Sequence, residues 1–458
     1  MGKLREETRV SATDVTGFAG RMTAFLEPYL NLLERREQRG HAEVYVEGRW
    51  RPLARRTLEP IATERGLKRR PLQHFVGAGK WDDGLLRDEQ CRQVAAEMGS
   101  SDGVLIIDGS GFQKAGPESV GTQRQWLGRL GKEEQCQVGE FLAYASKGSV
   151  TLVDCELYLP ETWAADPVRR KRCYVPKSVI FKTGWQLAAQ MVLGRGQLLP
   201  HRWVVGDENY GRPTELRDLL HDEEEQYVLE VPCEAKVRLA RGGDWIRACD
   251  WAASLPKRAW ETFTTRDGEK GPISVRAVKA RVYTPRSKES KRPERPETLV
   301  VVRNDSQHKT WTYLAEDTRT HLRELVRVGA CRHGVEQALN MGKGEVGLDE
   351  YEVRSWIGWH HHMTLTMLSL WFLVQEHRRV KKTLQRSPLL RSAAYWLLRS
   401  PSSATKRRSP SSSPGSSSGT TKPGVTTGRA SENAPRRGSR RVHRWATETD
   451  RAQPAQSN

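Results

Sequence analysis

The stretch Gly103-Val-Leu-Ile-Ile-Asp108-Gly-Ser-Gly111 decides the fold. Its run of branched apolar residues is typical of a strand buried on both faces, and the run ends at a carboxylate followed by glycine. Trp203-Val-Val-Gly-Asp207 repeats this pattern later in the chain. Further elements are predicted between and after these two, as strands at 149–158 and 227–232 and as helices at 185–193 and 214–220. Strands that alternate with helices predict an α/β sheet.

The segment before this core, residues 1–100, is mainly helical in its pattern. Apolar residues recur there at steps of three and four, which indicates helices that bury one face. Arginine and lysine gather between Arg49 and Arg70. This basic stretch fits either a solvated helical face or a DNA-contacting domain, because phosphate binding needs clustered cations.

The first part of the core spans residues 101–232. The segments that follow it differ from it and from one another in composition. Residues 233–318 are rich in β-formers, glycine and proline, which predicts an all-β insertion. Helical patterns return over 319–385, at about 320–341 and again at about 351–384. The remaining segment, 386–458, is dominated by Ser, Pro, Gly, Thr and Arg, and this composition predicts a disordered basic tail.

Composition excludes several classes of protein. The chain has 458 residues and a net charge of +19, and residues 378–458 alone hold 18 Lys and Arg against three acids. The longest apolar run, Met363–Val374, is about a dozen residues long, whereas a membrane span needs ~20. No secretory signal is visible at the start. The seven cysteines are dispersed without a Cys-x-x-Cys pair, which argues against a disulfide framework and a structural zinc site and favours the cytoplasm.

Acidic residues mark the candidate site. Asp108 and Asp207 each end a buried strand beside glycine. Each aspartate taken alone could simply cap a loop. The two together favour a functional site at the edge of a sheet. Farther along, Arg332, Glu336 and Lys343 are spaced to share one face of a single helix, and the glycines beside Lys343 predict fraying there. That spacing also fits an ordinary surface ion pair.

Three blocks together resemble the DDE transposases of bacterial insertion sequences, in the RNase H-like DDE endonuclease superfamily. The branch with the greatest similarity is the seven-oh-one insertion-sequence group, related to the group-four elements. The blocks are 108–139, which starts Asp-Gly-Ser-Gly-Phe, 157–211, which ends Gly-Asp-Glu-Asn-Tyr-Gly, and 336–365. Arg332, Glu336 and Lys343 match the wider group's Tyr-x2-Arg-x3-Glu-x6-Lys signature, with Gly329 at the Tyr position.

The resemblance implies an RNase H-like catalytic core that is interrupted by the β-rich insertion. It implies that Asp108, Asp207 and Glu336 are catalytic and bind two Mg²⁺ ions, with Mn²⁺ tolerated, and that Arg332 and Lys343 bind DNA. Such ions activate a water or a DNA 3′-OH and stabilise the leaving oxygen. The implied function is cleavage at terminal inverted repeats and strand transfer into target DNA, by a homodimer on double-stranded DNA in the nucleoid.

Two alternatives remain open from the residues. A decayed or repurposed transposase would bind DNA without cutting it. A glycoside hydrolase would use two carboxylates but would need neither Arg332 nor Lys343.

Overall fold

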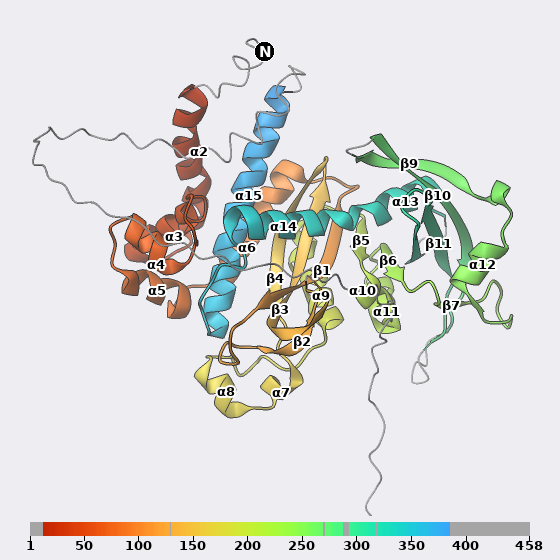
Figure 1. The fold of residues 1–458 in the computed structure, drawn as a ribbon, viewed down its shortest axis with the longest axis horizontal. Helices are drawn as coiled ribbons and strands as arrows, with labels where there is room; N and C mark the ends of the chain where they lie inside the picture. The colour runs from red at the N-terminus through yellow and green to blue at the C-terminus, as the bar shows by residue number, and fades with distance from the viewer. Residues whose placement is uncertain (1–11, 129, 269–270, 287–292, 317–318, 385–458) are drawn as a thin grey trace, which may run out of the picture. The chain divides into compact units, whose positions relative to one another are not determined.

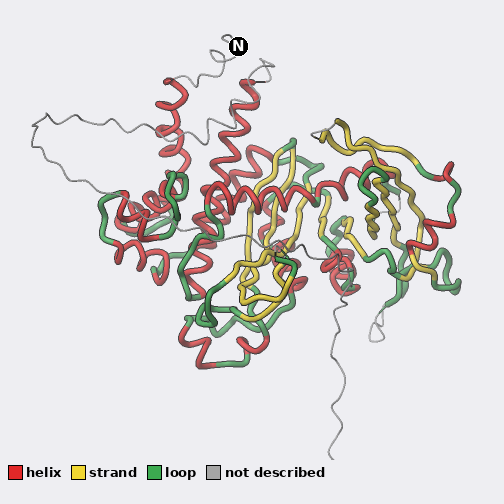
Figure 2. The backbone as a smooth tube through the Cα atoms, viewed as in Figure 1, coloured by secondary structure: helices red, strands yellow, loops and turns green. Residues whose placement is uncertain are grey.

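The computed structural model describes residues 12–128, 130–268, 271–286, 293–316 and 319–384 (Figure 1). Figure 2 shows helices and strands succeeding one another along this part of the chain, so the mixed α/β class is confirmed. The tail predicted to be disordered, 386–458, lies outside the described residues.

In the described part of the chain before the sheet, residues 12–98 consist mainly of helices. Its helices are α2 (Ala12–Asn31), α3 (Arg36–Gly48), α4 (Leu58–Glu64), α5 (Arg69–Ala78) and α6 (Asp83–Met98). The long helix α15 (Trp356–Leu384) packs against α3, α5 and α6 on one side and against the sheet strand β4 on the other. This packing buries the apolar run Met363–Val374 completely. Among the described residues, none of the helices combines the length and apolar character needed to cross a bilayer.

The core strands form one part of a ten-stranded sheet. They are β1 (Val104–Gln113), β2 (Gln123–Leu127), β3 (Lys132–Ser146), β4 (Ser149–Leu157), β5 (Trp203–Gly206) and β6 (Tyr227–Val231). Strand β3 is antiparallel to β1 and β4, whereas β5 is parallel to β1 and to β6. The order across the core is therefore β4-β3-β1-β5-β6. Three parallel strands, β1, β5 and β6, end at the same edge.

The segment 233–318 continues this sheet. Its long strands are β9 (Glu261–Gly268), β10 (Gly271–Val282), β11 (Glu297–Asn304) and β12 (Lys309–Ala315), and β12 pairs antiparallel with β6. The short strands β7 (Lys236–Val237) and β8 (Ile246–Arg247) form a separate ladder. The expectation of an all-β insertion is wrong, because helix α12 (Ala248–Ser254) and the 3₁₀ turn η2 (Lys257–Ala259) lie within it. Trp251 of α12 is buried in the same apolar cluster as Leu299 of β11, which accounts for this helix.

Helices lie on both faces of the core sheet. The remaining helical elements are α7 (Glu161–Ala164), α8 (Pro167–Arg172), α9 (Gly184–Leu193), the 3₁₀ turn η1 (Arg195–Leu198), α10 (Glu208–Gly211), α11 (Thr214–Asp222), α13 (Leu322–Cys331) and α14 (His333–Val346). Of these, α9, α10, α13 and α14 pack against core strands. Gly334 of α14 lies against Ile106 of β1, whereas Gly196 of η1 lies against Leu105. Because strand residues alternate between faces, Asp108 shares the α14 face with Ile106.

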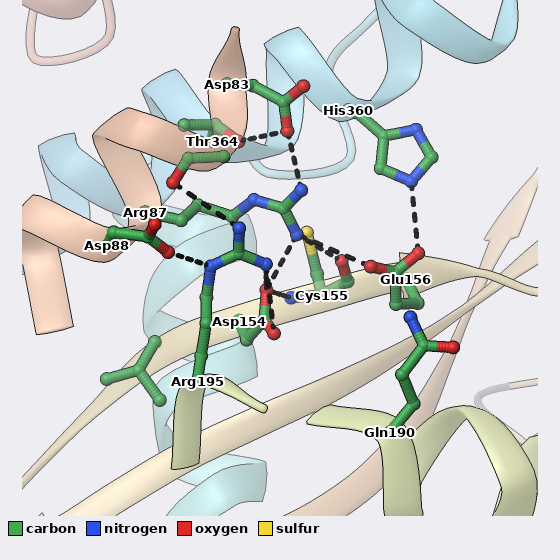
Figure 3. A network of polar contacts seen from close by, with 12 residues as sticks. Asp83, Arg87, Asp88, Asp154, Cys155, Glu156, Gln190, Arg195, His360 and Thr364 are labelled. Atoms are coloured by element: carbon green, nitrogen blue, oxygen red, sulfur yellow. Dashed lines mark hydrogen bonds and ion pairs between the residues drawn. The ribbon is translucent and has the colours of Figure 1, made fainter. Parts of the chain in front are cut away.

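A buried polar network fastens α6 to the sheet (Figure 3). Arg87 of α6 donates to Asp154 of β4 at 2.6 Å and to Asp83 at 2.7 Å. Arg195 of η1 donates to the same Asp154 at 3.2 Å and to Asp88 at 2.7 Å. One buried carboxylate therefore joins three separate elements of the fold.

Candidate active site

Three acids lie side by side at the carboxyl ends of the parallel strands. The register pairs Ile107 of β1 with Gly206 of β5, and Gly206 with Leu229 of β6. The next residues along these strands are Asp108, Asp207 and Glu230. The two aspartates predicted from the sequence are thus brought together, as is expected for a site at the carboxyl edge of a parallel sheet.

Asp207 is held by the turn that follows β5. Its carboxylate accepts from the backbone N–H of Asn209 at 2.9 Å and from the Asn209 side-chain amide at 3.2 Å. This capping contact starts the short helix α10. At the end of that helix Gly211 lies directly against the backbone carbonyl of Glu230, where a Cβ atom would be only 1.9 Å from the oxygen. Glycine is required for this close approach.

The acids at the strand edge are desolvated, and the positive charge of Arg332 offsets this only in part. Burial and the neighbouring carboxylate of Asp207 raise the pKa of Asp108 to about 8, against the opposing effect of Arg332. Burial also raises the pKa of Asp207 and that of Glu230. A carboxylate that is buried next to other carboxylates is stabilised either by taking up a proton or by binding a cation.

Arg332 joins the strand edge to α14. Its guanidinium lies 3.1 Å from Glu230 and 3.0 Å from Glu336, and His333 lies 2.9 Å from the same Glu336 carboxylate. The expected single helix from 320 to 341 is divided here, since α13 ends at Cys331 and α14 begins at His333. Arg332 nevertheless has helical dihedral angles. Arg332 and Glu336 therefore keep the i,i+4 contact of a continuous helix, although the helix is divided between them and α13.

Lys343 contacts β1 two residues beyond Asp108. Its ammonium group donates to the Ser110 hydroxyl at 2.8 Å and lies 5.0 Å from the ring centroid of Phe112. Ser110 and Phe112 follow Asp108 at steps of two, so all three share one face of the strand. The expected fraying beside Lys343 is wrong: α14 continues to Val346 because Gly342 is buried against Leu348.

Glu140 is a further acid that sequence reasoning missed. It lies on β3 opposite Gly109, on the face of the sheet away from α14. The Tyr210 hydroxyl donates to its carboxylate, and burial raises the pKa of Glu140 to about 7. A glutamate in the otherwise apolar run of β3 was the available signal. Its position supports the turn that carries Asp207, since Tyr210 belongs to α10.

The donor chemistry partly fits a divalent metal. Asp108 and Asp207 supply the hard oxygen ligands that Mg²⁺ takes. Glu336 instead faces Arg332 and His333. Accordingly, among residues the structure describes, no three His, Cys, Asp or Glu side chains are grouped to hold one ion. The triplet His360–His362 is structural: His361 and His362 bond to the backbone carbonyls of Val76 and Leu348.

Adjacent acids at a strand edge, with Arg332 and Lys343 on the same face of the sheet, have chemistry compatible with phosphoryl transfer. The sequence profile of the DDE superfamily endonucleases matches residues 28–272, and the chain belongs to this family. The matched range includes Asp108 and Asp207 and ends before Glu336. A search of curated proteins gave no match. Family membership makes the chain, at this coarse level, a nuclease that acts on DNA.

Asp108→Asn is expected to stabilise the metal-free protein at neutral pH. The folded-state pKa of Asp108 is about 8, well above the ~3.9 of an unfolded aspartate. The folded state then binds more protons, so the wild type loses stability as pH rises from about 4 to about 8. Asparagine does not ionise, so the stability of the Asp108→Asn protein should not fall with pH for this reason. Thermal unfolding of both proteins in EDTA should show a gap that opens with pH, and a constant gap would contradict the assignment.

Proposed function

We propose that the chain is a metal-dependent transposase that cleaves DNA at the terminal inverted repeats of an insertion sequence and joins the ends to target DNA. The observation that carries this proposal is the pair Asp108 and Asp207, adjacent at the ends of β1 and β5, with Arg332 and Lys343 on the same face. Membership of the DDE endonucleases supports it at the level of the family.

The core topology supports an RNase H-like arrangement. One antiparallel meander, β1-β3-β4, is followed by β5 and β6, which add in parallel to the other side of β1. In this proposal the chain is related to the seven-oh-one branch and acts as a homodimer, because two element ends must be cut in one complex. The site faces double-stranded DNA, and the protein is associated with the nucleoid in the cytoplasm.

Asp108 and Asp207 would hold the metal, with Glu336 as the third acid. Two Mg²⁺ ions, or Mn²⁺ in their place, would activate a water or a 3′-OH and stabilise the leaving oxygen. Arg332 now neutralises Glu230 and Glu336. A DNA phosphate bound at Arg332 would compete for that guanidinium and free Glu336 toward the aspartates. Arg332 and Lys343 would position the phosphate by charge-assisted hydrogen bonds.

Cleavage of end-bearing DNA tests the proposal. Purified protein is incubated with linear duplexes that carry the repeats flanking its reading frame, in Mg²⁺, in Mn²⁺ or in EDTA. Strand breaks at the repeat boundary that require metal are expected, together with joined products when target plasmid is added. Specific binding without any cleavage would instead favour the repurposed DNA-binding protein, and cleavage that persists in EDTA would contradict the carboxylate site.

Lys343→Ala is expected to lower strand transfer at least about tenfold, which is the loss of ~1.4 kcal/mol of transition-state stabilisation. The reason is that its ammonium group lies over the strand that carries Asp108. Folding should be little affected, since the lost hydrogen bond to Ser110 is worth about 1 kcal/mol. Strand transfer and thermal unfolding are measured together, with Lys147→Ala in the β3–β4 turn as the control. If Lys343→Ala transfers strands as fast as the wild type, Lys343 has only a structural role.

A further inference from the structure

Helices α4 and α5 have the dimensions of a helix-turn-helix. They span seven and ten residues and are separated by the four residues Arg65 to Lys68. Gly66 has φ +66°, and the backbone N–H of Leu67 donates to the Ala62 carbonyl at 2.8 Å. This is the Schellman ending that turns the chain sharply after a helix. A short turn of this kind with glycine is typical of DNA-binding helix pairs.

One face of α5 is fixed in the core. Leu72, Phe75 and Val76 are buried, and α5 packs against α15. The Ser355 hydroxyl donates to the Gly77 carbonyl at 2.7 Å, and His361 lies 3.1 Å from the Val76 carbonyl. The end of α5 is therefore held on α15, whereas the residues at its beginning, 68–71, are exposed. Rigid presentation of this kind is what a recognition helix needs.

The opposite face of α5 is polar and unengaged. Arg70, Gln73 and His74 fall on it at helical spacing, and Arg70 and His74 are exposed. Within the described part of the chain, the side chains of these three residues make no hydrogen bond or ion pair with another residue. Lys68, the N-cap residue just before α5, is likewise exposed, and its side chain is unpaired among the described residues. Arg69, in contrast, pairs with Glu59 of α4 at 2.8 Å. This face of α5 therefore presents hydrogen-bond donors that have no partner among the described residues.

We propose that α4 and α5 form a helix-turn-helix that places α5 in the major groove of double-stranded DNA. Arg70 and Gln73 read base edges, since arginine pairs with guanine O6 and N7 and glutamine with adenine N6 and N7. Lys68 contacts a backbone phosphate, which fixes register without reading sequence. The inference rests on the proposed function, because it assigns the surface that selects the element ends, separately from the acids that cut them.

Selection from duplexes with a random central segment tests the inference. Wild-type protein should enrich a consensus, and Arg70→Ala and Gln73→Ala should each weaken binding to it by roughly 5- to 150-fold and relax one base position. Lys68→Ala should weaken the consensus and a scrambled duplex alike and reduce the salt slope by about 1. Arg92→Gln, an exposed arginine on α6 paired with Glu89, is the matched control and should bind as wild type does.

Metal-dependent nicking of a plasmid without the consensus separates this inference from the proposed function. The wild type should nick it, and Lys68→Ala should nick it more slowly, because the lost phosphate contact is independent of sequence. All three variants should unfold at the wild-type temperature. Wild-type discrimination by Arg70→Ala and Gln73→Ala, or an equal loss by these two variants on both duplexes, would overturn the recognition role of α5. The absence of any wild-type consensus would overturn it as well. Failure of the wild type to nick DNA at all would count against the proposed function, with the binding result still deciding the role of α5.

Discussion

Replacing Asp108 or Asp207 with asparagine is expected to lower DNA strand cleavage by about a thousandfold or more. The two carboxylates lie at adjacent register positions on β1 and β5. Groups that act as a unit lose most of their catalysis when any one is removed. Asparagine keeps the shape and can still cap α10 at position 207, but it lacks the charge that attracts a divalent cation.

DNA binding should persist in both variants, because the proposed recognition surface lies on α5. A gel-shift and a cleavage assay on the same duplex separate the two effects. Asp102→Asn, an exposed position just before β1, provides the matched control and should cleave normally. Near-wild-type cleavage by Asp108→Asn or Asp207→Asn would remove that carboxylate from the site.

Arg87→Ala is expected to destabilise the fold by about 3–5 kcal/mol, because breaking a buried ion pair leaves an uncompensated charge. Arg87 contacts Asp154 at 2.6 Å and Asp83 at 2.7 Å, and all three lie inside the network of Figure 3. Burial already raises the pKa of Asp154 although two arginines oppose it. Urea unfolding should show a large drop in the midpoint.

The control for this prediction is a surface pair on the same helix. Arg92→Ala breaks the exposed contact with Glu89 and should change stability by at most about 1 kcal/mol. A double-mutant cycle with Asp154→Asn gives the coupling between Arg87 and Asp154 directly. If Arg87→Ala loses less than about 1 kcal/mol, Arg195 alone satisfies Asp154 and the network is not cooperative.

The sequence predicted the elements that carry Asp108 and Asp207 because their strands are short apolar runs closed by glycine, a local signal. It could not predict the neighbourhood of Glu140, which depends on the register of β3 against β1. It also could not show that Lys343 meets Ser110, because this contact joins residues 233 positions apart. The catalytic role of Glu336 stays a prediction, and in the structure its carboxylate faces Arg332.

Two predictions from the sequence were wrong because they used the local conformational preference of the residues, which takes no account of tertiary packing. Glycine beside Lys343 suggested fraying, but Gly342 is where Leu348 packs closely against α14. The strand-rich composition of 233–318 suggested an all-β unit, but α12 is stabilised by its burial against β11 rather than by its own propensity.

The pairing of β12 with β6 has a consequence for how this chain can be altered. Four residues of β6, Val228–Val231, have their outer partners on β12. Excising 233–315 would strip those partners away and turn an interior strand into an open edge, a template for intermolecular aggregation. The segment is therefore not a detachable module. Length changes are best tolerated beyond β9, at the far rim of the sheet, where none of the strands β1, β5 and β6 loses a neighbour.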